Sequence, residues 1–452
     1  MAVDVVILAA GKGTRMKSAL PKVLHPIAGR PMLQHVIDTV NTLPDINLHV
    51  VIGHGAEAVR ETINGDINWL MQEEQLGTGH AVAQALPAVT AGNKLMVLYG
   101  DVPLIQTHTL EAMLDNVGSN DFALLTVDLE NPQGYGRIVR DKNGDVIAIV
   151  EQKDANSEQL AINEVNTGVM AGMADDFLCW LPELNNENAQ GEYYLTDVIA
   201  MACDEGKTIN TPQPQHEWEV LGVNNRSQQA ELERIYQGEQ AQRLMENGLT
   251  ILDPARIDIR GELIVGNDVV IDINAVFEGR VELKDGVRIG PNCCIKNSTV
   301  GEYTEIHANS ILEDSLVAES CQIGPFARLR PNTELKANAK VGNFVETKKT
   351  TVGEGSKINH LSYVGDAILG KNVNVGAGTI TCNYDGVNKF KTEIGDEAFI
   401  GSNTSLVAPV KVGEKGTVGA GSTITSEVGN EDLAVARGKQ RNISGWKRPV
   451  KK

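Results

Sequence analysis

Residues 394–406 read Ile-Gly-Asp-Glu-Ala-Phe-Ile-Gly-Ser-Asn-Thr-Ser-Leu, so that an aliphatic residue stands at every sixth position. The spacing continues through Val412, Val418 and Ile424, and it occurs in earlier runs of the second half of the chain. Those runs are Val265, Ile271, Phe277, Leu283, Ile289 and Ile295; then, after a slip of one residue, Val300, Ile306 and Leu312; Ile323, Leu329, Leu335 and Val341; and Val352, Ile358 and Val364. A period of six fits neither an α-helix, at ~3.6 residues per turn, nor a strand, at ~2. It is typical of a parallel β-helix, in which each hexad forms one short strand and one corner.

Small residues occupy a second fixed place in this repeat, four positions after many of the aliphatic residues. We expect both positions to point into a narrow prism, with glycine often following the aliphatic residue at the corner. The small residues are Cys293, Thr299, Thr304, Ser310, Ala327, Ser356, Ser362, Ala398, Thr404 and Ser422.

The first half of the chain has a different period. Short apolar runs at 5–8 and 95–99 are typical of buried parallel strands and end in glycine-containing loops, and 31–43 and 80–89 have helical spacing. This alternation predicts a Rossmann-like α/β domain with a mostly parallel sheet. A Gln-, Glu- and Arg-rich segment predicts a linker helix that ends before Gly248. The expected domains are therefore 1–226, a linker helix at 227–247, and a β-helix at 248–452.

Composition excludes several classes of protein. The 452 residues are 42% hydrophobic and carry a formal net charge of −19, which argues against a general nucleic-acid binder. No apolar run reaches the ~20 residues of a membrane-spanning helix, and the N-terminus lacks the basic segment of a signal peptide. The six cysteines show no zinc-binding spacing, and we expect free thiols in a cytoplasmic protein.

Two loops of the first half carry candidate chemistry. The segment Ala9-Ala10-Gly11-Lys12-Gly13-Thr14-Arg15-Met16 follows a predicted strand, and its glycines would let backbone N–H groups approach phosphates. Arg15 and Lys22 add the positive charge that a polyphosphate needs. Asp101 follows another strand, and one carboxylate together with substrate phosphates is a common way to hold Mg²⁺. An ordinary tight turn and a solvated loop aspartate are the structural alternatives.

Three segments of the first half resemble a known family. Leu8–Met16 with Pro21-Lys22, then Gln72–His80, and then Leu98–Asp101 are similar to motifs of the sugar-1-phosphate nucleotidyltransferases. With the hexad repeat behind them, nearly the whole chain resembles the bacterial members that also carry an N-acetyltransferase. The resemblance implies acetylation of glucosamine-1-phosphate by acetyl-CoA, followed by transfer of UMP from UTP to N-acetylglucosamine-1-phosphate, in the synthesis of cell-wall precursors.

The resemblance also implies the residues of the uridylyl-transfer site. Arg15 and Lys22 would be catalytic, and Asp101 and Asn224 would hold Mg²⁺. Gly136, Glu151 and Asn166 would contact the amino sugar, although a turn glycine and a surface carboxylate are alternatives for the first two. The remaining nucleotide contacts would be Leu8, Ala9, Ala10, Gly11, Lys22, Gln72, Gly77, Thr78, Tyr99 and Gly100.

The second half departs from its repeat between Thr379 and Glu393. Val375 and Ile394 are 19 positions apart, one more than three hexads, and the interval contains the turn signal Asn383-Tyr384-Asp385-Gly386 followed by Lys389 and Lys391. We expect a loop that leaves the prism, and such loops commonly cover sites.

His360 stands two positions after Ile358, so we expect it to face outward. A lone histidine is often structural. Within the resemblance, the segment Lys357–Tyr363 matches the stretch that provides the general base of acetyl transfer. An amine must lose a proton to attack a thioester, and imidazole can accept one near neutral pH.

The resemblance supplies the other acetyltransferase residues, a left-handed sense for the β-helix and a homotrimer with sites between subunits. The sugar phosphate would bind Arg330, Lys348, Tyr363 and Asn374. Acetyl-CoA would meet Ala377, Asn383, Tyr384, Ser402, Ala420 and Arg437. The tail 437–452 has seven basic residues and no acidic one, which fits either a solvated tail or attraction for the phosphates of CoA.

Two other functions are compatible with this pattern. The β-helix of a nucleotidyltransferase can serve only for assembly or regulation, and release of CoA in the presence of glucosamine-1-phosphate would distinguish that case. A non-catalytic binding subunit is disfavoured, because Arg15, Lys22, Asp101 and Asn224 are all present.

Overall fold

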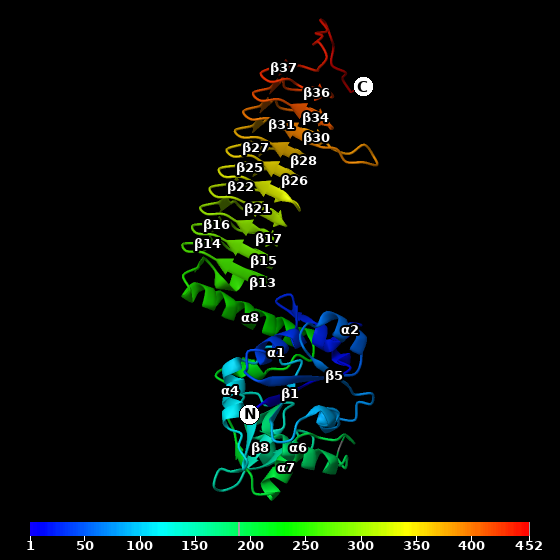
Figure 1. The fold of residues 1–452 in the computed structure, drawn as a ribbon, viewed down its shortest axis with the longest axis vertical. Helices are drawn as coiled ribbons and strands as arrows, with labels where there is room; N and C mark the ends of the chain where they lie inside the picture. Colours follow the sequence, from blue (N-terminus) through cyan, green and yellow to red (C-terminus); the bar gives the residue numbers. More distant parts are fainter. Residues whose placement is uncertain (189, 452) are drawn as a thin grey trace. The chain divides into compact units, whose positions relative to one another are not determined.

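A computed structural model describes residues 1–188 and 190–451 (Figure 1). The chain divides into two compact units, Met1–Tyr236 and Gln237–Lys452. The first is an α/β domain and the second is a stack of parallel strands, so the predicted fold class is confirmed.

A nine-stranded sheet forms the centre of the first unit, with β11-β7-β10-β6-β1-β4-β5 as its main path. Strands β1, β4, β5 and β6 are mutually parallel, whereas β10 runs antiparallel to β6 and β7. The strands are β1 (Val3–Ala9), β4 (Ile46–Ile52), β5 (Asn68–Met71), β6 (Lys94–Tyr99), β7 (Asp121–Asp128), β8 (Arg137–Arg140), β9 (Val146–Val150), β10 (Glu164–Met173) and β11 (Thr208–Asn210), beside the small pair β2 (Pro26–Ile27) and β3 (Arg30–Pro31).

Helices cover both faces of this sheet, with an apolar cluster on each face. The helices are α1 (Met32–Val40), α2 (Ala56–Thr62), α3 (Thr78–Ala83), α4 (Thr107–Asp115), α5 (Ser157–Leu160), α6 (Ala174–Trp180) and α7 (Asp197–Asp204). The chain leaves β1 for β4 on one side and returns to β6 on the other, so β1 and β6 flank the point at which strand order reverses. Ligands of open α/β sheets bind outside the carboxyl ends of such strands.

The second unit is a parallel β-helix, drawn as stacked coils in Figure 1. An 11-stranded sheet contains β12 (Thr250–Ile251), β14 (Val270–Ile271), β16 (Arg288–Ile289), β19 (Glu305–Ile306), β22 (Gln322–Ile323), β25 (Lys340–Asn343), β27 (Lys357–His360), β29 (Asn374–Val375), β32 (Phe399–Ile400), β35 (Thr417–Val418) and β37 (Leu433–Ala434). A 15-stranded sheet contains β13 (Ile257–Val265), β15 (Ala275–Leu283), β17 (Cys294–Lys296), β18 (Thr299–Val300), β20 (Ile311–Glu313), β21 (Ser315–Val317), β23 (Arg328–Leu329), β24 (Thr333–Leu335), β26 (Glu346–Val352), β28 (Tyr363–Leu369), β30 (Ile380–Cys382), β31 (Thr392–Ile394), β33 (Ser405–Val407), β34 (Val410–Val412) and β36 (Thr423–Ile424).

The six-residue period explains this stack. Nearly all of the repeating aliphatic residues lie in one continuous core, and only Val265 among them is half-buried. The prediction is wrong for one of the small residues expected to point inward. Thr299 is half-exposed, and Ser298 is buried in its place, because the slip of one residue before Val300 moves the inward position back by one.

The coils are not all of one length. Val375 pairs with Ile400, 25 residues on, whereas the neighbouring coils of this sheet advance by 17 or 18, as from Val341 to Ile358 and from Ile400 to Val418. The extra residues form the loop between β30 and β31 that projects from the stack in Figure 1. The interval from Val375 to Ile394 used to predict this loop therefore understates it, because the true partner of Val375 is Ile400.

Helix α8 (Arg226–Glu246) occupies the segment expected to link the domains, and the division into units falls within it. Leu232 is buried in an apolar cluster of the first unit, and Leu244 packs against the core of the second. Gly248 follows the helix with φ +98°. No helix in the described part of the chain is long and apolar enough to cross a membrane. All six cysteines, each of them described, are free thiols.

Candidate functional site

A cavity of about 230 Å³ opens at the carboxyl ends of β1 and β6. It is lined by Leu8, Ala9, Ala10, Gly11, Lys22, Val23, Gln72, Gln75, Gly77, Thr78, Ala81, Tyr99, Asp101 and Glu192. Ten of these are residues that the resemblance assigns to the nucleotide site, contributed by four separate segments. The backbone turn after β1 and the start of α3 therefore face one space.

A charged centre lies at the rim of this cavity. The Lys22 ammonium forms a close ion pair with Asp101 and donates a 2.8 Å hydrogen bond to Asn224 Oδ1. Arg15 Nη2 donates to the same amide oxygen, also at 2.8 Å. Gly13 makes this approach possible, because a β-carbon there would lie 2.5 Å from Lys22 Cβ and the residue has φ +57°. The side-chain oxygens of Asp101 and Asn224 thus meet the cations of Arg15 and Lys22, although these four residues come from positions distant in the sequence.

The residues expected to hold the amino sugar form a second group nearby. Asn166 N donates to the carbonyl of Gly136 at 2.9 Å, and a β-carbon on Gly136 would lie 3.4 Å from Glu151 Oε1. Burial raises the pKa of Glu151, and the charges of Asp154 and Asp197 add to this. Burial also raises the pKa of Tyr99, with the charges of Asp101 and Glu151 adding to it, so the hydroxyl of Tyr99 stays protonated.

Four cavity residues were not anticipated from the sequence. Val23 is adjacent to Lys22, Gln75 lies inside the Gln72–His80 segment, Ala81 lies in α3 just after that segment, and Glu192 comes from a loop far along the chain. The hydrogen bond from Tyr193 N to Leu76 O brings that loop to the nucleotide segment. Only the first three had a local signal in the sequence, namely their neighbours.

In the β-helix, four of the expected acetyl-transfer residues lie in one column. Successive coils are joined by backbone hydrogen bonds that stack His360, Ala377, Ser402 and Ala420 one above another, and the amides bonded to the first three are those of Gly378, Asn403 and Gly421. Because rungs of a parallel sheet are ~4.8 Å apart, this column spans ~15 Å. Arg437 Nη1 donates to Ala420 O at 2.6 Å, which places this tail residue at the end of the column.

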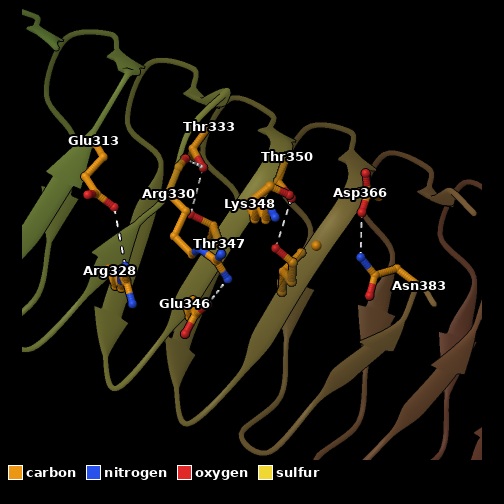
Figure 2. A network of polar contacts seen from close by, with 12 residues as sticks. Glu313, Arg328, Arg330, Thr333, Glu346, Thr347, Lys348, Thr350, Asp366 and Asn383 are labelled. Carbon is orange, nitrogen blue, oxygen red and sulfur yellow. Dashed lines mark hydrogen bonds and ion pairs between the residues drawn. The ribbon is translucent and has the colours of Figure 1, made fainter. Parts of the chain in front are cut away.

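A basic cluster lies on the 15-stranded sheet (Figure 2). Arg330 donates a 2.7 Å hydrogen bond to Glu346, and Arg330 stands beside Lys348 on the neighbouring rung. The positive charge of Lys389, followed by that of Arg330, lowers the pKa of Lys348. Three cationic side chains therefore lie close together here. Lys389 was expected only as part of the projecting loop, and the structure adds it to this cluster.

The remaining sugar-phosphate residues do not all come to this cluster. Tyr363 does, because its hydroxyl lies over Gly365, where a β-carbon would be 2.4 Å away, and Gly365 pairs with Lys348. Asn374, however, belongs to β29 of the 11-stranded sheet, which pairs with β27, the strand that carries His360. In one copy of the chain, the residues expected to bind a single sugar phosphate are therefore divided between two sheets.

The projecting loop is fastened at its base. Asn383 Nδ2 donates to Asp366 at 2.5 Å (Figure 2). Phe390 N donates to Asn383 O at 2.9 Å. Tyr384 is exposed on the loop, whereas the Asn383 side chain is buried. A second cavity of about 420 Å³ lies between the loop and the corner of the stack, lined by Asn332, Lys349, Thr351, Asp366, Ala367, Ile368, Lys389, Phe390 and Lys391.

Comparison with known proteins agrees with both halves. Residues 5–250 match the model of the MobA-like NTP transferase domain, and residues 259–333 match that of the GMPPB C-terminal domain. The chain is 64% identical to the bifunctional protein GlmU of Marinobacter nauticus, covering 99% of both chains, and 59% identical to that of Pseudomonas putida, covering 100% of this chain and 99% of the relative. The chain belongs to the GlmU family.

Membership in the GlmU family assigns a nucleotidyltransferase domain to the α/β unit. Among solved structures, a UDP-glucose pyrophosphorylase complexed with UDP-glucose matches 52% of this chain and 98% of its own, with a TM-score of 0.43 and 16% identity. The family name describes a bifunctional protein, and the chain has two separate groups of candidate site residues, one in each unit.

Proposed function

We propose that the β-helix acetylates glucosamine-1-phosphate with acetyl-CoA and that the α/β unit then transfers UMP from UTP to N-acetylglucosamine-1-phosphate. The observation that carries the proposal is the presence of two groups of candidate site residues in separate units. One is the cavity beside Lys22, Asp101 and Asn224, and the other is the column above His360. Membership in a bifunctional family supports the same conclusion.

Uridylyl transfer needs positioning and charge neutralisation. A phosphate oxygen of the sugar attacks the α-phosphorus of UTP, the bond to the β-phosphate breaks, and pyrophosphate leaves. Because the attacking oxygen is already anionic, no general base is required. The backbone of Ala9–Gly11 would approach the phosphates, and Arg15 and Lys22 would stabilise the charge that develops on them.

The donors beside the cavity fit Mg²⁺. Asp101 and the Asn224 carbonyl are hard oxygen ligands, and both already contact one cationic atom, Lys22 Nζ. We propose that these two residues hold the ion, with phosphate oxygens and water as its other ligands. When bound, Mg²⁺ neutralises phosphate charge and orients the leaving group.

Acetyl transfer needs a base. The glucosamine nitrogen attacks the thioester carbonyl, its proton passes to His360, and the C–S bond breaks as the sulfur takes up a proton to give CoA. The basic cluster of Arg330, Lys348 and Lys389 would bind the sugar phosphate, with Tyr363 beside it. Ala377, Ser402, Ala420 and Arg437 would contact acetyl-CoA along the column, and Asn383 and Tyr384 would contact it from the projecting loop.

We propose that the acetyltransferase site is completed between copies of the chain in a homotrimer. This explains why Asn374 and His360 lie on one sheet and Arg330, Lys348 and Tyr363 on the other. Mixing His360→Ala and Lys348→Ala proteins, denaturing and reassembling them together, should restore part of the activity. A site built within one chain would give none. We further propose a cytoplasmic location, where acetyl-CoA and UTP are available.

An omission experiment tests the function. Glucosamine-1-phosphate, acetyl-CoA, UTP and Mg²⁺ are supplied, each is left out in turn, and products are measured by mass spectrometry. UDP-N-acetylglucosamine should require all four, whereas N-acetylglucosamine-1-phosphate should form without UTP. If the β-helix only assembles or regulates the enzyme, no CoA is released, and nucleotide sugar forms only from supplied N-acetylglucosamine-1-phosphate.

A further inference from the structure

We propose that Asn343 is a positioning residue that holds His360 in the tautomer with its proton on Nδ1. The Nδ1 atom of His360 lies 2.7 Å from Oδ1 of Asn343. The inference rests on the proposed acetyltransferase function, because it concerns the base of that reaction.

The geometry comes directly from the β-helix. Asn343 ends β25 and His360 ends β27, and the two residues are register partners 17 positions apart in the parallel ladder. Asn343 is half-buried and lies beside His360 on the preceding coil, whereas Ala377 lies beside His360 on the following coil. The backbone thus fixes the distance between the two side chains.

The hydrogen bond to Asn343 determines which nitrogen of the His360 ring carries the proton. An amide oxygen can only accept, so the imidazole must donate through Nδ1–H, and the lone pair is then on Nε2. In the described part of the chain, the His360 ring makes no second side-chain hydrogen bond, which leaves Nε2 available to a substrate. Nε2 takes the proton from the amine as the C–N bond forms and returns it to the sulfur as the C–S bond breaks.

The surroundings of His360 are electrically neutral along the column. Its rung neighbours are Asn343 and Ala377, and Ser402 follows. The charged residues of the two strands, Lys340 and Lys357, stand at their opposite ends, three residues or ~10 Å away. An amide therefore orients the ring without adding charge beside it.

Two substitutions of Asn343 distinguish a role in orienting the His360 ring from a purely structural role. Asn343→Ala removes the acceptor, and kcat for acetylation should fall on the order of tenfold, with little change in the KM of either substrate. Asn343→Asp keeps the acceptor and adds a negative charge beside the ring. It should keep activity within a few fold at pH 8.5 and move the acidic limb of kcat/KM up by about one pH unit. Lys340→Ala, on the same strand, is the matched control and should change neither quantity.

The His360→Ala background distinguishes this inference from the proposed function. If His360 is the base, its loss lowers acetylation ~10²–10⁴-fold, and adding Asn343→Ala should then cost almost nothing more. If His360→Ala is active, the proposed base is wrong. If His360→Ala is inactive but Asn343→Ala stays within twofold of wild type, the positioning role is wrong. An unshifted pH profile, or lost activity, in Asn343→Asp also overturns it, because an amide that donates to Nδ1 cannot be replaced by a carboxylate.

Discussion

Lys22 and Asn224 are 202 residues apart in the chain, and the Lys22 Nζ atom donates a hydrogen bond of 2.8 Å to Asn224 Oδ1. The same ammonium pairs with Asp101, so the three residues form a single charged centre. The centre joins the loop after β1, the loop after β6 and the segment that leads into α8. A substitution that removes the side-chain oxygen of Asp101 or Asn224 therefore leaves Lys22 in place and changes only the capacity of the centre to hold a cation.

Substitution Asp101→Ala should abolish uridylyl transfer and leave acetylation near the wild-type rate. The triphosphate loses a metal ligand, whereas the basic cluster and His360 belong to the other unit. The measurement is the rate of pyrophosphate release and, separately, the rate of CoA release over a range of Mg²⁺ concentrations. A folded Asp101→Ala protein that has lost both activities would show that the two units do not act independently.

Substitution Lys389→Ala should raise the KM for glucosamine-1-phosphate about tenfold and change kcat little. Lys389 supplies the largest part of the repulsion that lowers the pKa of Lys348. Without it, the cluster attracts a phosphate less strongly, and the pKa of Lys348 should move upward. The matched control is Lys371→Ala, an exposed lysine paired with Glu354 at 3.1 Å. Equal effects in the two variants would mean that only overall charge matters.

Substitution Cys293→Ala should retain acetyltransferase activity within a few fold. The thiol is buried in the core, donates to His307 O at 3.3 Å, and has a pKa that burial raises to about 11. A protonated, enclosed thiol is a poor nucleophile. In native protein it should therefore resist iodoacetamide longer than the exposed Cys179, as followed by peptide mass spectrometry. A collapse of turnover in a folded Cys293→Ala protein would point to a thiol in the chemistry.

Substitution Asp4→Asn should make the first unit less sensitive to acid. Burial alone would raise the pKa of Asp4, but hydrogen bonds from Asn93, His49, Thr90 and Asn47 outweigh it and lower the pKa. A lowered carboxyl pKa gives stability that is present above the unfolded value of ~3.9 and is lost as pH falls through the folded value. Wild type should therefore lose stability below about pH 4.

Urea unfolding at pH 3 to 6, followed by tryptophan fluorescence, measures this effect, because Trp69, Trp180 and Trp218 lie in the first unit. Asp4→Asn should show a smaller loss between pH 5 and pH 3 than wild type. Asp66→Asn, which alters an exposed aspartate, is the control and should behave like wild type. Asp4→Ala, which leaves buried donors without an acceptor, should lower the free energy of unfolding by about 3 kcal/mol.

Residue spacing was enough to predict the β-helix, because each hexad buries its own aliphatic residue and the prism repeats. Thr299 shows the limit of that reasoning, since a slip of one residue reassigns the inward position to Ser298. Site residues on local motifs, such as Gly11 and Thr78, were predictable as candidates. Glu192 and Lys389 were not, because a distant loop and a projecting loop bring them into place through tertiary contacts that no local pattern records.

The long coil of the β-helix has a consequence for engineering. Register in the stack depends only on the residues at the rungs, and Val375 pairs with Ile400 despite the 25-residue path between them. Removing residues 383–390 would leave a coil of ~17 residues, the length of its neighbours, so the scaffold should close without shifting any later rung. The corner after Cys382 should therefore tolerate insertions. Peptides or whole domains could be grafted there, and the coils on either side should still fold.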